Sequence, residues 1–236
     1  MADAGGDPAS RTERSRAVAK KVGVILSGCG VYDGAEIHES VVTLLAIDRA
    51  GAEAVICAPD IPQMHVVNHL SGEVEQGAKR NVLVESARIA RGKIRDVAKV
   101  KADEIDALII PGGFGAAKNL CNFAVKGPDC TVNEPVARLV REVHAQGKPV
   151  AAVCIAPALL AKVLGKDEPK LTIGTDADTA GALEKLGAKH VSCAVREVVV
   201  DRENKLVTTP AYMLAERISE AAEGIEKTVK ALLELA

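Results

Sequence analysis

The stretch GKPVAAVCIAPALLAKVL, residues 147–164, joins a short apolar run to a helix-like run through a single cysteine. Residues 149–153 form a continuous apolar run of the kind found in a buried strand of a parallel sheet. Residues 158–164 continue with strong helix formers. The stretch therefore predicts a tight strand-to-helix turn, with Cys154 on that turn at the carboxyl end of a buried strand.

Similar apolar runs alternate with helical patterns along the rest of the chain. We expect strands at 21–28, 52–60, 106–113, 149–154 and 170–175. We expect helices at 36–50, near 115–124, and at 134–147, 158–164, 179–188 and 211–236, the last with a break near Gly224. This alternation predicts an α/β fold, with a mostly parallel sheet covered by helices on both faces. Ligands of such sheets bind beyond the carboxyl ends of the strands.

Three segments fit this pattern less directly. Residues 61–85 hold two short extended runs around a polar middle, which predicts a hairpin-like excursion or an ordered loop. Residues 86–100 are typical of a short helix or of a polar connection. Residues 193–210 predict a hairpin that turns at 201–204, where polar residues interrupt the β-branched runs.

Composition limits the classes of protein that the chain can belong to. Its 236 residues, 48% of them hydrophobic, suit one sizeable domain or at most two small ones. A formal net charge of −2 gives no reason to expect nucleic acid or an anionic membrane as a partner. No apolar run approaches the roughly 20 residues of a membrane-spanning helix. The six cysteines include no C-x-x-C pair, so we interpret them as free thiols.

Residues 1–20 are polar and small, which predicts a disordered tail before a single domain at 21–236. The tail lacks the apolar core of a secretory signal. Its Arg and Ser residues resemble an organelle transit peptide, whereas Asp3, Asp7 and Glu13 are atypical of one. We therefore expect a cytoplasmic protein, with a mitochondrial location as the alternative.

Cys154 is the first candidate for chemistry. Its predicted turn sets the thiol against the first N–H groups of the following helix, and a helix N-terminus lowers a thiol pKa. This predicts a reactive, accessible thiolate. The alternative is an inert core cysteine, which is our interpretation of Cys57.

Two neighbouring segments can assist such a thiol. The glycines of IIPGGFG, residues 109–115, offer free N–H groups, so the N–H groups of Gly113 and Ile155 are candidates for an oxyanion hole. Glu36 and Glu39 open the helix at 36–50. Helix capping explains at least one of them, but Glu39 shares a face with apolar residues. Burial there would raise its carboxyl pKa and suit it to acid/base chemistry.

The other candidates are weaker. His65 and His69 have the i, i+4 spacing of a helical metal pair, but Val66 and Val67 between them favour an extended backbone, and no third ligand is evident. We expect no metal and no cofactor, with Glu36 and both histidines as possible pocket residues. Cys29 follows the first strand and is a candidate resolving thiol for Cys154.

Six ordered blocks resemble a known family: ILSGCGVYDGAEIHES, APDIPQMHVVNHLSGE, RNVLVESARIARGKI, IIPGGFGAAKNL, CIAPALLAKVL and NKLVTTPAYM. Together they resemble the ElbB-like branch of the ThiJ/PfpI superfamily, a group of class I glutamine amidotransferase-like proteins. The resemblance implies a flavodoxin-like three-layer sandwich with Cys154 on the nucleophile elbow and Glu39 as the acidic residue that contacts it. It also implies a homodimer. Relatives in the superfamily include glutathione-independent glyoxalases and deglycases, so the resemblance implies an activity of that kind.

One departure from the superfamily pattern affects the expected activity. Ile155, and not histidine, follows Cys154, and residues 170–178 contain no histidine either. A Cys-His-Glu triad is therefore not supported, and amidotransferase activity is not expected. We expect an enzyme that converts a small 2-oxoaldehyde such as methylglyoxal to the 2-hydroxy acid. The alternative is a non-enzymatic redox sensor or binding protein.

Overall fold

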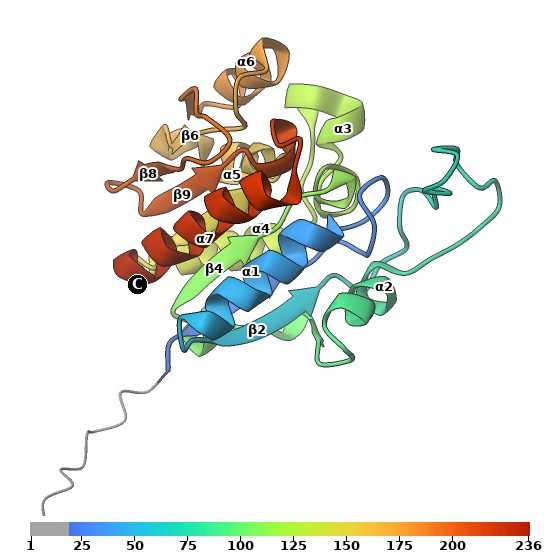
Figure 1. Cartoon of the computed structure of the whole chain (residues 1–236), viewed down its shortest axis with the longest axis horizontal. Helices are drawn as coiled ribbons and strands as arrows, with labels where there is room; N and C mark the ends of the chain where they lie inside the picture. The colour runs from blue at the N-terminus through green and yellow to red at the C-terminus, as the bar shows by residue number, and fades with distance from the viewer. Residues whose placement is uncertain (1–18) are drawn as a thin grey trace, which may run out of the picture.

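The computed structural model describes residues 19–236, and the main feature is a seven-stranded sheet with the strand order β3-β2-β1-β4-β5-β9-β8 (Figure 1). All neighbouring strands are parallel except β8 and β9, which form an antiparallel hairpin. The strands are β1 (Lys21–Ile25), β2 (Glu53–Ala58), β3 (Arg95–Asp96), β4 (Ala107–Ile110), β5 (Val150–Val153), β8 (Val199–Asp201) and β9 (Leu206–Thr209). The predicted tail lies almost entirely outside the described residues.

Helices cover both faces of this sheet, which gives three layers. Figure 1 shows α1 and α7 side by side in front of the strands, with α4 and α5 behind them. The α-helices are α1 (Ile37–Arg49), α2 (Val82–Ile89), α3 (Phe123–Lys126), α4 (Glu134–Ala145), α5 (Pro157–Leu164), α6 (Ala177–Lys185) and α7 (Ile218–Leu235). The predicted flavodoxin-like α/β fold is confirmed. None of the described helices has the length and apolar character needed to cross a bilayer.

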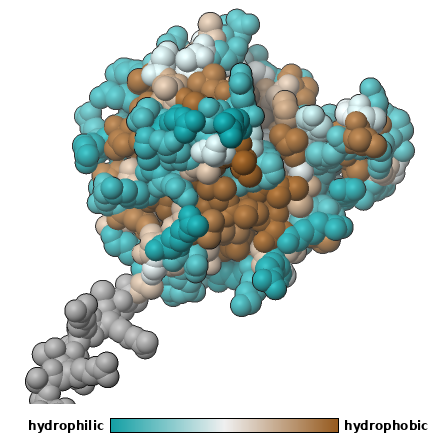
Figure 2. Space-filling view, viewed as in Figure 1, coloured by the Kyte–Doolittle hydropathy of each residue, from teal (hydrophilic) through white to brown (hydrophobic). Residues whose placement is uncertain are grey.

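Side-chain alternation along the strands builds one hydrophobic core on each face. In β4, Leu108 and Ile110 pack with α4 and α5, whereas Ala107 and Ile109 pack with α1 and α7. Because successive side chains point to opposite faces and helices cover both, every position of a central strand is buried, which explains why these strands are continuous apolar runs. Hydrophobic residues also reach the molecular surface (Figure 2), and α1 leaves Ile37, Val41 and Leu45 between 41% and 49% exposed.

Two of the segments that fit the strand–helix alternation less directly have the structure predicted for them. The hairpin at 193–210 is present as β8 and β9. Residues 61–81 form a hairpin-like excursion, in which Pro62 pairs with Asn81 and Val67 pairs with Val74 in antiparallel bridges. The excursion ends earlier than expected because the Asn81 side chain caps α2, accepting the N–H of Val84.

Other segments differ from the prediction. Only Lys170–Leu171 of the expected strand at 170–175 is extended, as β6, and it pairs with β7 (Lys189–His190) in a separate two-stranded sheet. The expected helix near 115–124 is a π-helical segment, Ala116–Leu120, followed by the short α3. The strand β3 was not predicted, because two polar residues give no apolar pattern.

The C-terminal helix α7 begins later than predicted, because residues 211–213 form a separate 3-10 turn. It also runs through Gly224 without the predicted break. Gly224 packs against β9, where a Cβ atom would lie 2.7 Å from Oγ1 of Thr209. Close packing, and not helix interruption, therefore explains this glycine.

Candidate active site

Cys154 lies on a strained turn between β5 and α5. Its φ angle is +62°, a left-handed conformation that non-glycine residues rarely adopt. The turn is held on both sides: the N–H of Cys154 donates to Thr209 O over 3.0 Å, and the N–H of Ala156 donates to Val153 O over 3.0 Å. The predicted nucleophile elbow is therefore present, with strain of the kind that clusters at functional sites.

Glu39 lies beside this elbow and is completely buried. Its Oε2 accepts the backbone N–H of Gly112 at 2.9 Å, and its Oε1 accepts that of Tyr212 at 3.2 Å. Its carboxyl group also lies next to the thiol of Cys154, since the two side chains meet at Gly112 and each shifts the pKa of the other. Four segments that are remote in sequence, α1 and the exits of β4, β5 and β9, thus meet at one carboxyl group.

The close approach of Glu39 and Cys154 depends on Gly112. A Cβ atom at this position would overlap Cβ of Cys154 and would lie 2.6 Å from Oε2 of Glu39. Any other residue would therefore push the carboxyl and the thiol apart.

Burial sets the electrostatics of Glu39. Loss of solvent, and then the nearby charge of Glu36, raise its carboxyl pKa from 4.5 to about 7, against the lowering effect of its hydrogen bonds. The raised pKa predicted from the sequence is confirmed. A carboxyl group that titrates near neutral pH can both accept and return a proton.

The thiol of Cys154 differs from the prediction. The side chain is only 8% exposed, and burial raises the thiol pKa well above its ordinary value, with a further rise from the charge of Glu39. The N–H groups of Gly113 and Ile155 face the sulfur and lower the pKa, but burial outweighs them. The predicted accessible thiolate is therefore wrong, because the helix N-terminus acts on a sulfur withdrawn from solvent. The resting group is a thiol.

Gly113 and Ile155 are thus where the sequence places them, beside the reacting sulfur. Gly113 has a φ of +92°, and a Cβ atom there would overlap the backbone of Gly34 and Glu36. The role of the Gly113 and Ile155 N–H groups as oxyanion donors stays a prediction.

A cleft of about 450 Å³ opens over Cys154. Its lining is mainly apolar, with one carboxylate and two hydroxyl side chains: Val31, Glu36, Gly113, Phe114, Cys154, Ile155, Thr179, Tyr212 and Met213. Phe114, Thr179, Tyr212 and Met213 were not predicted as site residues. The block NKLVTTPAYM contains a strand, and Tyr212 and Met213 come shortly after it, which is the one signal that could have indicated them.

Glu36 serves the helix and the cleft together. Its Oε2 accepts the N–H of Glu39 at 2.6 Å, which caps α1, and the residue also lines the cleft. The capping interpretation and the pocket interpretation therefore both hold for this residue.

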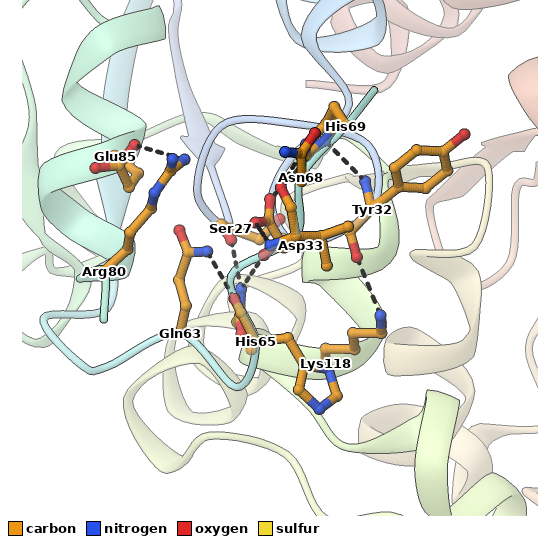
Figure 3. Close-up of polar contacts among 12 residues, drawn as sticks. Ser27, Tyr32, Asp33, Gln63, His65, Asn68, His69, Arg80, Glu85 and Lys118 are labelled. Atoms are coloured by element: carbon orange, nitrogen blue, oxygen red, sulfur yellow. Dashed lines mark hydrogen bonds and ion pairs between the residues drawn. The ribbon is translucent and has the colours of Figure 1, made fainter. Parts of the chain in front are cut away.

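The structure does not bring Cys29, His65 or His69 to the cleft. Figure 3 shows both histidines in a separate cluster where the excursion 61–81 packs against residues 27–33. There, Nε2 of His69 accepts the N–H of Tyr32 at 3.2 Å. Among the described residues, no group of three His, Cys, Asp or Glu side chains could hold a metal ion.

Cys29 is half-buried beside charged residues of the same region. The charges that act on its thiol belong to Glu85, Arg88, Asp33 and Arg80, and burial raises its pKa. Neither Cys154 nor Glu39 is among these neighbours, so the structure gives no support to Cys29 as a resolving thiol for Cys154.

Comparison with known proteins shows the family to which this fold belongs. The DJ-1/PfpI family profile matches residues 29–216 of the chain. The human glutamine amidotransferase-like class 1 domain-containing protein 3, mitochondrial, is 49% identical over 97% of this chain and 91% of its own length. The ES1 protein homolog, mitochondrial, of Rattus norvegicus is 50% identical over 91% of this chain and 84% of its own length.

A solved structure shows that the fold is shared as well. The isoprenoid biosynthesis protein with amidotransferase-like domain from Ehrlichia chaffeensis superimposes with a TM-score of 0.85 and 35% identity, covering 92% of this chain and 100% of that one. The chain belongs to the DJ-1/PfpI family, and the resemblance inferred from its sequence blocks is confirmed.

Proposed function

We propose that the chain is a glutathione-independent glyoxalase that converts methylglyoxal or glyoxal to the corresponding 2-hydroxy acid. The observation that carries this proposal is the adjacent pair of Cys154 and Glu39, with a carboxyl pKa of about 7, at the base of a cleft. A nucleophile and an acid/base group within hydrogen-bond reach are the parts that such a conversion requires.

The first step is addition of the thiol to the aldehyde carbon C1. Because Cys154 is protonated at rest, the ionised Glu39 accepts its proton as the S–C1 bond forms. The N–H groups of Gly113 and Ile155 stabilise the developing charge on the aldehyde oxygen O1. Glu39 then returns the proton to O1, which leaves a hemithioacetal and a carboxylate.

The second step is an internal redox change of the bound substrate. Glu39 removes the proton from C1, a C1=C2 bond forms, and the ketone oxygen O2 gains a proton. Glu39 then protonates C2 while O1 loses its proton, so that C1 is oxidised to a thioester and C2 is reduced to an alcohol. Water cleaves the thioester, releasing the hydroxy acid and the thiol.

Two relatives support this reaction class. The deglycase PfpI of Pyrococcus furiosus is 33% identical over 44% of this chain and 52% of its own length. Glyoxalase III of Candida albicans shares the fold, with a TM-score of 0.58 at 14% identity. Deglycation begins with the same attack of a thiol on a carbonyl carbon, so the cleft supports either substrate type.

The redox-sensor alternative receives less support from the site. Oxidation of a cysteine depends on thiolate character and access, whereas Cys154 is buried with a raised pKa. We also propose a mitochondrial location over the cytoplasmic one, because the human and rat relatives both carry "mitochondrial" in their names.

The decisive experiment measures lactate formed from methylglyoxal without glutathione, by the wild type and by Cys154→Ala. We expect lactate from the wild type and none above background from the variant. Cys57→Ala, a change at a buried cysteine of β2, is the matched control and should retain turnover. Absence of lactate from the wild type, or equal lactate from Cys154→Ala, would refute the proposal.

A further inference from the structure

Tyr212 contacts both the candidate acid/base group, through its backbone, and an exposed histidine, through its hydroxyl. It lines the cleft with Cys154, and its backbone N–H donates to Oε1 of Glu39 at 3.2 Å. Its hydroxyl lies 2.8 Å from Nδ1 of His38, and the two rings are 5.8 Å apart between centroids. His38 is exposed at the start of α1. A continuous chain of groups therefore leads from solvent through His38 and Tyr212 to the cleft.

The backbone before Tyr212 is strained. Ala211 has a φ of +43° although it is not glycine, and it is completely buried. The strands that precede the two strained residues, β5 and β9, are paired, with Val153 opposite Thr209. Strain of this kind persists only where the surrounding structure enforces it. Two strained positions at neighbouring strand ends thus fix Cys154 and Tyr212 on the same cleft.

We propose that Tyr212 is a second catalytic acid/base residue of this site, and that His38 exchanges its proton with solvent. The inference rests on the proposed glyoxalase function. It answers a difficulty in that mechanism: Glu39 carries the proton that moves from C1 to C2, so a different group must protonate O2 at the same time. Two side chains that line the cleft carry hydroxyl groups: Thr179 is bonded to the carboxylate of Asp176, whose pKa is lowered, whereas the Tyr212 hydroxyl contacts the imidazole of His38.

The proton balance follows from the His38 tautomer. When Nδ1 carries a proton, it donates to the phenol oxygen and leaves the phenol O–H free to point into the cleft. As Glu39 removes the C1 proton, Tyr212 gives its proton to O2 and takes one from Nδ1 of His38, while Nε2 of this exposed imidazole takes a proton from solvent, so that His38 stays neutral. When the thioester forms, Tyr212 takes the proton that leaves O1 and returns its own to Nδ1 of His38, and Nε2 releases a proton to solvent. No external oxidant or reductant enters.

Burial favours the neutral form of Tyr212 that such a donor requires. Loss of solvent, followed by the charges of Glu36 and Glu39, raises the phenol pKa. The group therefore keeps its proton until charge develops on O2 in the reaction.

The test is Tyr212→Phe, assayed for lactate formation and for the covalent adduct of methylglyoxal on Cys154 by intact-protein mass. We expect kcat to fall roughly 100-fold with KM changed less than about threefold, because one acid/base group is lost. The adduct should form at the wild-type rate and accumulate. Tyr32→Phe, which alters the other tyrosine of the chain outside the cleft lining, is the matched control and should retain kcat.

A second variant separates proton exchange from packing. His38→Gln keeps a side chain that can donate to the phenol oxygen but cannot exchange a proton near neutral pH. We expect kcat to fall about tenfold, and imidazole in the buffer to restore it because His38 is exposed.

The outcomes distinguish the two proposals. Wild-type protein that forms no lactate refutes the glyoxalase function and the role of Tyr212 with it. Wild-type turnover with unchanged kcat in Tyr212→Phe refutes only the role of Tyr212. The same holds if Tyr212→Phe loses adduct formation along with kcat, since the tyrosine then only shapes the site.

Discussion

The Glu39 carboxyl group lies next to the Cys154 thiol at the carboxyl end of β5, and both are withdrawn from solvent. Each is an acid whose charged form burial disfavours. The negative charge of Glu39 also raises the pKa of the thiol. The thiol therefore keeps its proton at neutral pH, whereas Glu39, with a pKa of about 7, is partly ionised and can accept that proton. The nucleophile is activated by proton transfer within the pair and not by prior ionisation.

This coupling predicts opposite effects of Glu39→Gln on reactivity and on turnover. Removing the charge should lower the pKa of Cys154, so alkylation of this thiol by iodoacetamide at pH 8 should become faster. Lactate formation should fall by roughly 10²- to 10⁴-fold, because the acid/base group is lost. Peptide mass spectrometry measures the first quantity, and a lactate assay measures the second.

The control for this variant is Glu142→Gln, which removes an exposed carboxylate on α4. It should change neither quantity. Slower alkylation of Cys154 in Glu39→Gln would show that the carboxylate assists ionisation of the thiol, contrary to the electrostatics described above.

Glu39 should also make stability depend on pH. Its folded pKa of about 7 exceeds the ordinary value of 4.5, so the native state binds the proton more tightly than the unfolded chain does. The stabilising effect is complete below about pH 4.5 and is lost as pH rises through 7. The difference amounts to about 3 kcal/mol in the free energy of unfolding.

Urea unfolding of the wild type and of Glu39→Gln at several pH values between 4.5 and 8 isolates this contribution. The amide does not titrate, so the wild type should lose stability relative to the variant as pH rises. Parallel curves for the two proteins would contradict a raised carboxyl pKa.

The six thiols should differ in their reaction with iodoacetamide in the native protein. Cys29 is the half-exposed one, whereas Cys57 and Cys121 are buried with pKa values raised to about 12. We therefore expect Cys29 to be modified first at pH 8, with Cys57 and Cys121 last. Mass spectrometry of peptides over time gives this order. Modification of Cys154 before Cys29 would show that its thiol is ionised and accessible, and would favour the redox-sensor alternative.

Local sequence patterns account for the strands, the helices and the elbow. Continuous apolar runs predict β1, β2, β4 and β5, because a strand buried on both faces needs apolar residues on both. The position of Cys154 after such a run predicts the turn. Burial of Glu39 also follows from its helical face.

What could not be predicted depends on contacts between distant segments. The depth of Cys154 is set by Gly112 and by Glu39, so a local turn pattern gives the wrong thiol pKa. His65 and His69 have suggestive spacing, but the excursion that carries them packs against residues 27–33 and not over the elbow. Tyr212 joins the site because β9 pairs with β5, and strand order does not follow from an alternating pattern.

Gly112→Ala tests the tight packing at the base of the cleft. The added methyl group would overlap Cys154 and lie 2.6 Å from Oε2 of Glu39, so it must push the carboxyl and thiol apart. We expect the free energy of unfolding to fall by about 1–3 kcal/mol, as for other overpacked sites, and lactate formation to fall with it.

Gly181→Ala is the matched control, because Gly181 lies in α6 with nothing within 4 Å of its added Cβ. That change should raise the free energy of unfolding by roughly 0.5–1 kcal/mol through helix propensity and leave turnover unchanged. Urea unfolding and the lactate assay on both variants measure these effects, and a Gly112→Ala protein with wild-type stability and turnover would mean that the Glu39–Cys154 contact is looser than described.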